Sequence, residues 1–189
     1  MNKKAKIGIC GNVGSFSEEA AIHYCQKNKI EDYELVYLIT AENTLSAVTL
    51  GEVDKGIFPI ENSNGGIVYE SVYAMAKYTF NIEKMFDIDV RHCLLVLPGK
   101  KLEDINKIAS HQQALKQCKM YLKKRWPDAE LLDWPDTAQA ARDLNEGNLT
   151  PDTAVVAPLV CSKLYNLDVL EEGIQDLKFN FTTFIAAVK

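Results

Sequence analysis

Residues 85–98 read MFDIDVRHCLLVLP, an apolar stretch rich in β-branched residues that is long for a single strand. We expect this segment to leave one sheet and to enter a second. The chain leads back through residues 173–189, which end in the strand-like pattern FNFTTFIAAVK. Two crossings of this kind predict two interlocked α/β lobes with an interlobe cleft.

Apolar runs alternate with helical patterns on both sides of the crossing, as in α/β proteins. Before it, the strands KIGICG, YELVYLI and KGIFPIENS are separated by the helices SFSEEAAIHYCQKN and TLSAVTLGEV. After it, INKIAS, AELLDW and TAVVAP alternate with the helices ALKQCKMYLKKRW and TAQAARDLNEG. We therefore expect one domain over 1–189, with lobe 1 at about 1–84 plus 175–189 and lobe 2 at about 85–174.

The composition is that of a soluble globular protein, with 189 residues of which 47% are hydrophobic and 25% are charged. No apolar run reaches the length of a membrane span, and a net charge of -5 argues against a nucleic-acid partner. The five cysteines are scattered without a C-x-x-C pair, which predicts that most are buried free thiols and that there is no zinc site. The apolar part of MNKKAKIGICG is too short for a secretory signal, so a cytoplasmic location is expected.

Two glycine-containing segments carry polar groups that a plain core would not use. GNVGSFSE (11–18) follows a strand and opens a helix, so its backbone N–H groups and its serine hydroxyls could receive a carboxylate or a phosphate. An ordinary serine-capped turn explains this segment equally well. PIENSNGG (59–66) is dense in hydrogen-bonding side chains, although a turn rich in Asn and Gly is also a common surface feature.

SHQQALKQC (110–118) places a serine and a histidine at the expected start of a helix. Sequence neighbours seldom face each other as a nucleophile and its base, so a capping role for Ser110 competes with a catalytic one. His23 and His92 are lone histidines on apolar segments, where packing or a simple hydrogen bond is the commoner role.

IQDLKFNFTTF (174–184) is expected to be extended in its last residues. Side chains alternate along a strand, so Asn180, Thr182 and Phe184 share one face. Phe181 and Thr183 point to the other face. Only one of the two threonines can therefore face a cleft fully.

Taken together and in order, these segments resemble the catalytic domain of prephenate dehydratases. The matching segments over residues 6–186 include GNVGSFSEEAA, GEVDKGIFPIENSNGGIV, IDVRHCLL, SHQQALKQC, DTAQAA, AVVAPLVCSKLYNLDVL and IQDLKFNFTTF. The resemblance implies a type II periplasmic-binding-protein-like pair of lobes. It implies a lyase of phenylalanine biosynthesis that converts prephenate, a small dicarboxylate, to phenylpyruvate, water and CO2 without metal or organic cofactor. It also implies a homodimer, and the match leaves no room for a regulatory ACT domain.

The resemblance further implies which residues form the site. The implied catalytic residues are Thr182, Ser110, Gln117, Glu61 and Asn62. The implied substrate-binding residues are Ser15, Phe16, Ser63, Gly66, Asn180, Thr183 and Phe184.

One position departs from the family pattern. The family's T-R-F triplet reads T-T-F here, so Thr183 stands where an arginine is expected to help hold the substrate anion. Threonine cannot replace a bidentate cation, although Arg91 or Lys178 could compensate. Three hypotheses stay open: a prephenate dehydratase, a relative with another dicarboxylate substrate or a non-aromatising decarboxylase activity, and a non-catalytic module that binds a small anion.

Overall fold

The computed structural model describes residues 4–189 and divides the chain into two compact units. Unit 1 runs to Asp89 and resumes at Phe181–Lys189, whereas unit 2 is the continuous stretch Val90–Asn180. Each unit contains a mixed sheet with helices, which confirms the predicted α/β class. The boundaries fall at 89/90 and 180/181, a few residues after those expected from the sequence.

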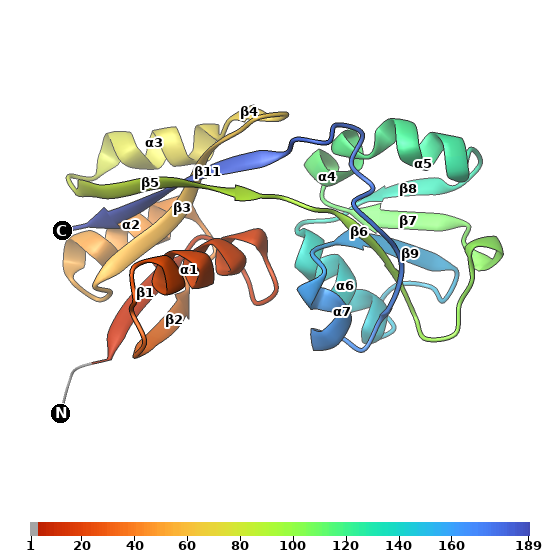
Figure 1. Ribbon diagram of the computed structural model, residues 1–189, viewed down its shortest axis with the longest axis horizontal. Helices are drawn as coiled ribbons and strands as arrows, with labels where there is room; N and C mark the ends of the chain where they lie inside the picture. Colours follow the sequence, from red (N-terminus) through yellow and green to blue (C-terminus); the bar gives the residue numbers. More distant parts are fainter. Residues whose placement is uncertain (1–3) are drawn as a thin grey trace. The chain divides into compact units, whose positions relative to one another are not determined.

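Unit 1 is built on a sheet with strand order β2-β1-β3-β11-β5, to which the short β4 adds by pairing with β3 (Figure 1). β1 pairs in parallel with β2 and β3, and β11 runs antiparallel between β3 and β5. The elements are β1 (Ala5–Ile9), α1 (Phe16–Lys27), β2 (Tyr33–Tyr37), α2 (Ala41–Leu50), β3 (Lys55–Asn62), β4 (Gly66–Ile67), α3 (Tyr69–Lys77), β5 (Asn81–Asp89) and β11 (Phe181–Val188).

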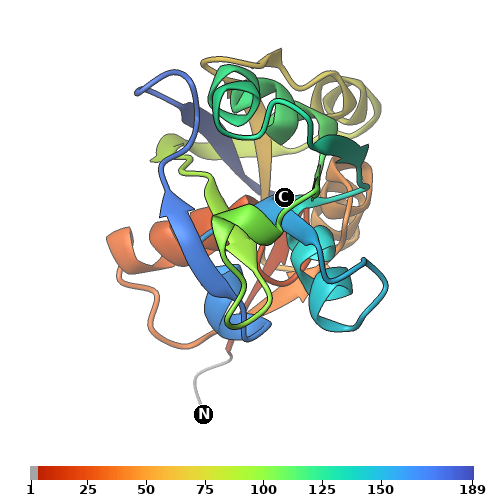
Figure 2. The ribbon, with the colours of Figure 1, turned by 90° about the vertical axis from the view of Figure 1, so that its right-hand side faces the viewer.

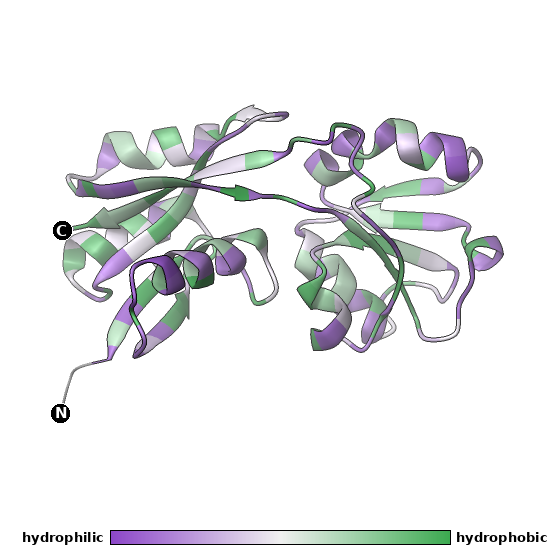
Figure 3. Ribbon diagram, in the orientation of Figure 1, coloured by the Kyte–Doolittle hydropathy of each residue, from purple (hydrophilic) through white to green (hydrophobic). Residues whose placement is uncertain are grey.

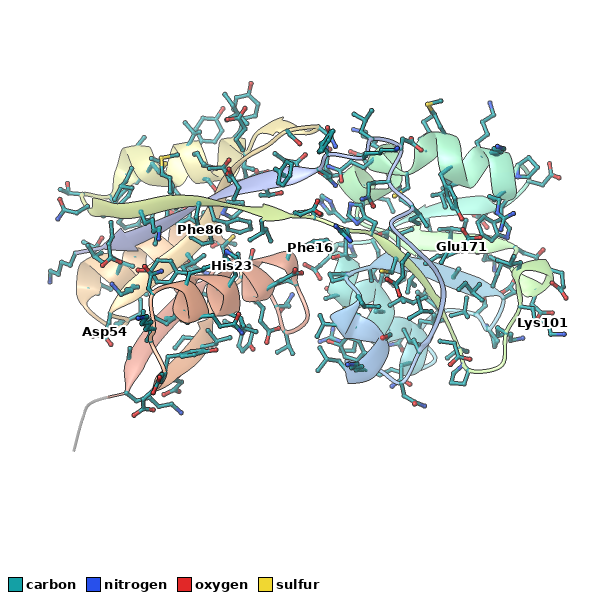
Figure 4. The ribbon with its side chains drawn as sticks, in the orientation of Figure 1. Phe16, His23, Asp54, Phe86, Lys101 and Glu171 are labelled. Carbon is teal, nitrogen blue, oxygen red and sulfur yellow. The ribbon has the colours of Figure 1, made fainter. Side chains whose placement is uncertain are left out.

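Alternation along β11 supplies side chains to both faces of the unit 1 sheet. On the α1 face, Phe184 stacks on Phe86, which also contacts Tyr24 of α1. The rings of His23 and Phe86 stack with their centroids 6.3 Å apart, so His23 has a packing role (Figure 4). On the opposite face, Ile185 joins a core that α2 and α3 complete.

Unit 2 has the strand order β10-β6-β9-β7-β8, in which β7 is parallel to β8 and β9 while β6 is antiparallel to β9 and β10. The elements are β6 (Cys93–Val96), η1 (Leu102–Asp104), β7 (Lys107–Ser110), α4 (Gln112–Gln117), α5 (Lys119–Arg125), β8 (Glu130–Asp133), α6 (Thr137–Asn145), β9 (Thr153–Ala157), α7 (Val160–Leu164) and β10 (Asp168–Glu172).

Helices cover both faces of the unit 2 sheet (Figure 2). Leu115 of α4 and Leu122 of α5 pack on one face with Ile108, and Leu144 of α6 packs on the other. The central strands β6 and β9 are apolar along their length, whereas much of α5 is polar (Figure 3). A strand that is buried on both faces needs such a continuous apolar run.

The helix predicted over ALKQCKMYLKKRW is interrupted in the structure. α4 ends at Gln117, Cys118 leaves the helical conformation with φ -109 and ψ 8, and α5 begins at Lys119. The carboxylate of Asp176 accepts hydrogen bonds from the backbone N–H groups of Met120 and Tyr121, both at 2.8 Å. This distant carboxylate satisfies donors that a new helix start leaves open, which explains why the break is stable.

Across residues 4–189 no helix has both the length and the apolar character needed to span a bilayer. All five cysteines are free, and four of them, Cys25, Cys93, Cys118 and Cys161, are buried. The prediction that most are buried thiols is confirmed. Burial raises the pKa of the Cys25 thiol to about 11.

Candidate functional site

The side chains of Asn62 and Thr182 meet across β3 and β11 in unit 1. The two residues are direct partners in the strand register, and Asn62 Nδ2 donates to Thr182 Oγ1 at 2.8 Å. Asn62 Oδ1 accepts from the backbone N–H groups of Asn64 at 2.9 Å and Gly65 at 2.8 Å. Because both donors hold the amide oxygen, the amide nitrogen must face Thr182.

This geometry determines what the Thr182 hydroxyl can do. Its oxygen accepts from Asn62, so its own proton is directed elsewhere and can be donated to another oxygen. Only 8% of Thr182 is exposed, so a partner of this hydroxyl would be largely shielded from water. The turn rich in Asn and Gly thus has a defined task, which is to orient Asn62 toward Thr182.

Thr183 lies on the other face of the same sheet. It pairs with Glu61 on β3 and with Asp87 on β5, and its hydroxyl donates to Asp87 Oδ1 at 2.6 Å. Glu61 shares this face because it is the direct partner of Thr183. Glu61 and Thr183 were expected in the site with Thr182, but they point to the opposite side of the sheet from it.

The polar groups of the segment that precedes and begins α1 form hydrogen bonds within the protein. Ser15 is 6% exposed, and its hydroxyl caps the helix by accepting from Glu18 N–H at 3.3 Å. The Glu18 carboxylate in turn accepts from Gly14 N–H and from the Tyr37 hydroxyl. Ser15 thus serves the capped turn that competed with a substrate role in the sequence. Phe16 is half-buried at the first position of α1 (Figure 4).

In unit 2 the amide of Gln117 lies at the junction of α4 and α5. Gln117 Oε1 is 2.7 Å from His92 Nε2 and accepts from Asn180 Nδ2 at 2.9 Å. Asn180 is fully buried and His92 is 3% exposed. Asn180 was expected to bind substrate, and its side chain donates a hydrogen bond to Gln117 inside the unit, so a substrate contact of Asn180 stays a prediction.

Two other predicted residues are also built into the interior. Ser110 is completely buried and donates to the backbone oxygen of Val156 at 2.6 Å, so its hydroxyl serves the sheet of unit 2. Its neighbour His111 caps α4 by accepting from Gln113 N–H, and the two do not form a nucleophile–base pair. Phe184 is 1% exposed and stacks on Phe86, which makes it a core residue.

Ser63 and Gly66 shape the turn between β3 and β4. Ser63 Oγ accepts from Phe181 N–H at 3.0 Å, and Phe181 O accepts from Ser63 N–H at 2.8 Å, which ties the turn to the start of β11. Gly66 has φ +77, a conformation that side-chain-bearing residues rarely adopt. Both residues support Asn62 through the backbone.

His92 makes a simple hydrogen bond, one of the two roles expected for a lone histidine on an apolar segment. The sequence did not reveal its partner, because the contact with Gln117 joins residues 25 positions apart. The signal that could have found this contact is the place of His92 in IDVRHCLL, one of the segments that carried the family resemblance. Burial lowers the pKa of His92, which favours the neutral imidazole.

Among residues 4–189 no group of three or more His, Cys, Asp or Glu side chains is placed to hold a metal ion. The candidate groups are instead amides and a hydroxyl: Asn62 and Thr182 in unit 1, and Gln117 in unit 2. Oriented hydrogen-bonding groups of this kind can fix the orientation of a small polar ligand. The chain belongs to the prephenate dehydratase family, whose sequence model matches residues 7–189.

Similar proteins include two that are named as dehydratases and one that is described by another activity. The chain is 33% identical over 183 residues to arogenate dehydratase 1 of Petunia hybrida, a match that covers 95% of this chain and 41% of that protein. The crystal structure of a prephenate dehydratase from Arthrobacter aurescens in complex with L-Phe is 27% identical, with a TM-score of 0.88 over 98% of this chain and 60% of that one. A structure described as a novel type of quorum quenching acylase, GqqA, is 25% identical, with a TM-score of 0.81 over 97% of this chain and 64% of that one.

The chain spans about two fifths of the length of the plant relative. The family is therefore established over the matched residues, and the activity and substrate of the chain follow as a proposal.

Proposed function

We propose that this chain is the catalytic part of a dehydratase that converts prephenate to phenylpyruvate, water and CO2. The observation that carries the proposal is the hydrogen bond from Asn62 to Thr182, which leaves the Thr182 proton available for donation. Membership of the prephenate dehydratase family supports the same reaction. Glu61, Ser110, Thr183 and Phe184 are left out of the proposed substrate contacts, because their side chains are directed elsewhere or buried.

The reaction breaks two bonds to the ring. The ring carboxylate departs as CO2, and the electron pair of its C–C bond moves into the ring. The ring hydroxyl departs with the electron pair of its C–O bond, takes up one proton from the solvent pool and leaves as water. Aromatisation of the ring provides the driving force, so the protein has mainly to ease the departure of the hydroxyl.

Thr182 is suited to that task as a hydrogen-bond donor. A threonine hydroxyl is too weak an acid to release its proton, but it can stabilise negative charge that develops on the departing oxygen. One donor placed in this way contributes on the order of 10²–10³ in rate. Gln117 is the corresponding candidate in unit 2, since the resemblance implies a catalytic role for it and its amide oxygen is held by His92 and Asn180.

Arogenate is the second candidate substrate. It carries an amino group where prephenate carries a keto group, and its dehydration yields phenylalanine directly. The likeness to a Petunia hybrida protein named arogenate dehydratase favours it. The chemistry at the ring is the same for both substrates, so Thr182 would have the same role.

The decisive experiment incubates the purified chain with prephenate and, separately, with arogenate. Formation of phenylpyruvate or phenylalanine at a rate that Thr182→Val reduces sharply would support the proposal. Three results would contradict it: an aromatic product formed equally fast by the Thr182→Val variant, a decarboxylated diene without aromatic absorbance, and binding without turnover. The last two correspond to the decarboxylase and binding-module hypotheses. The expected cytoplasmic location and homodimer stay predictions, and sedimentation of the purified chain tests the dimer.

A further inference from the structure

The orientation of the Gln117 amide depends on two donors that act on one oxygen. Asn180 Nδ2 lies 2.9 Å from Gln117 Oε1 and His92 Nε2 lies 2.7 Å from the same atom. The nitrogen of a carboxamide can only donate, so the atom of Gln117 that faces Asn180 must be its oxygen. His92 must then donate as well, so its Nε2 must carry a proton.

The two donors lie on segments that are themselves tightly held within unit 2. The backbone N–H of His92 donates to Gln175 Oε1 at 3.2 Å, and His92 O accepts from Ile174 N–H at 3.1 Å. Asn180 O accepts from Val90 N–H at 2.7 Å. Residues 90–92 and 174–180 therefore run side by side and bring His92 and Asn180 to the same point.

The backbone of Gln117 is fixed by the same return segment. Gln117 O accepts from Asp176 N–H at 2.7 Å, and the Asp176 carboxylate caps the helix that follows. Both ends of this residue are thus anchored, the main chain by Asp176 and the side-chain oxygen by His92 and Asn180. Rotating the amide by half a turn would set its nitrogen against two donors, which removes two buried hydrogen bonds.

We propose that His92 and Asn180 are positioning residues, which hold Gln117 Oε1 and thereby fix the orientation of the Gln117 amide. The inference rests on the proposed function, because it takes Gln117 as a substrate contact. It adds to that function two residues that act through Gln117 and do not themselves touch the substrate. Both are buried, which is consistent with this indirect role.

The kinetic test compares His92→Leu and Asn180→Ala, each of which removes one donor, with Gln117→Ala. Each positioning variant is expected to lower kcat by about 10- to 100-fold, as small misplacements of a reacting group do. KM should change less than kcat. His92→Gln keeps a nitrogen donor in a side chain of similar reach, so it should recover part of the lost kcat.

Double variants separate positioning from general damage. If His92 and Asn180 act through Gln117, adding either substitution to Gln117→Ala should lower kcat no further. Losses that multiply in the double variants would overturn the inference, and so would single variants with wild-type kcat. Trp126→Phe is the matched control, since it also removes a buried donor in unit 2, from Trp126 Nε1 to Leu102 O, and should leave kcat unchanged.

A second readout does not depend on activity. Nitrogen-15 NMR of the histidines should show the His92 proton on Nε2, and the Gln117 side-chain amide should give one ordered set of signals that broadens or shifts in His92→Leu. The inference would be overturned by a His92 proton on Nδ1, or by Gln117 amide signals that are unchanged in His92→Leu. If the wild-type chain acted on neither prephenate nor arogenate, the proposed function would fail while this measurement still decided the orientation of Gln117.

Discussion

Thr182 and Thr183 are neighbours in β11, yet they bind partners on opposite faces of the unit 1 sheet. Thr182 accepts from Asn62 at 2.8 Å, whereas Thr183 donates to Asp87 at 2.6 Å. One hydroxyl is therefore left with a proton to give, and the other has already given its proton. The pair offers an internal comparison in which two identical residue types have different expected roles.

The two threonines should respond differently to the same substitution. Thr182→Val removes the proposed donor while keeping the shape of the side chain, and we expect kcat to fall by about 10²–10³. Thr183→Val removes only the bond to Asp87 and should cost about 1 kcal/mol of stability with kcat retained. Steady-state kinetics and thermal unfolding of both variants check this, and equal kcat values in the two variants would contradict it.

Introducing an arginine at position 183 should change the stability of unit 1 little, because new ion pairs offset the lost hydrogen bond to Asp87, and should leave substrate affinity unchanged. The new side chain would lie on the face of the sheet that presents Glu61 and Asp87, so it would pair with carboxylates of the protein. Partly exposed ion pairs of this kind contribute about 0.2–1 kcal/mol. The measurements are the melting temperature and KM of Thr183→Arg. A sharp fall in the KM of Thr183→Arg would contradict this prediction and would indicate that the side chain at position 183 contacts the substrate.

Asn62→Asp should uncouple the turn from Thr182. The aspartate can still accept from the N–H groups of Asn64 and Gly65, so the turn should persist. It cannot donate to Thr182, and its second oxygen would instead attract the Thr182 proton. We expect a folded variant with a kcat loss comparable to that of Thr182→Val and no further loss when the two are combined. A wild-type kcat for Asn62→Asp would show that the orientation of Thr182 is unimportant.

Arg91 and Lys178 are exposed cations on the two segments of unit 2 that lead to unit 1. If either one binds a substrate carboxylate, its replacement by alanine should raise KM roughly tenfold with kcat retained, since hydrogen bonds to charged groups contribute about 1.5–3 kcal/mol. Lys124→Ala, on the exposed part of α5, is the matched control and should leave KM unchanged. Unchanged KM in both single variants and in the double variant would exclude these two cations as anchors.

Glu19 makes the stability of unit 1 depend on pH. Burial of its carboxyl and then the charge of Asp89 raise the pKa of Glu19 above its ordinary value of 4.5. The folded state therefore holds the proton more tightly than the unfolded state, so this contribution to stability is full in acid and is lost as the pH rises through the folded pKa. Glu19→Gln should be more stable than the wild type at neutral pH, with a gain that disappears below the ordinary carboxyl pKa. Denaturant unfolding across pH measures the difference, and a gain that persists in acid would contradict the assignment.

Local patterns predicted the elements of this fold well where composition and periodicity were strong. The crossing at residues 85–98 resolves into the end of β5 and the whole of β6, and the terminal strand is β11. The break at Cys118 was missed because its cause, Asp176, lies 58 positions later in the chain and leaves no local pattern. Helix propensity depends on residues that are close in sequence, whereas the start of α5 depends on a tertiary contact with Asp176.

The site was predictable in its residue types but not in its partners. Alternation along residues 180–184 correctly placed Thr182 and Thr183 on different faces. Which carboxylate or amide each would meet depends on the register between strands, which is set by pairing over about 100 residues of sequence and cannot be seen in any one segment. The hydrogen-bond partner of Ser110 could not be predicted for the same reason, because its acceptor, Val156 O, lies on another strand.

The position of β11 has a consequence for how the protein is made. Unit 2 is continuous in sequence, so all of its residues are present once Asn180 has been synthesised, but β11 lies between β3 and β5 and is synthesised after both of them. Until residues 181–188 have been synthesised, β3 and β5 have no strand between them. Asn62 then lacks its hydrogen-bond partner Thr182. The proposed donor is thus among the last parts of this fold to be assembled, so a chain that stops before Thr182 lacks it.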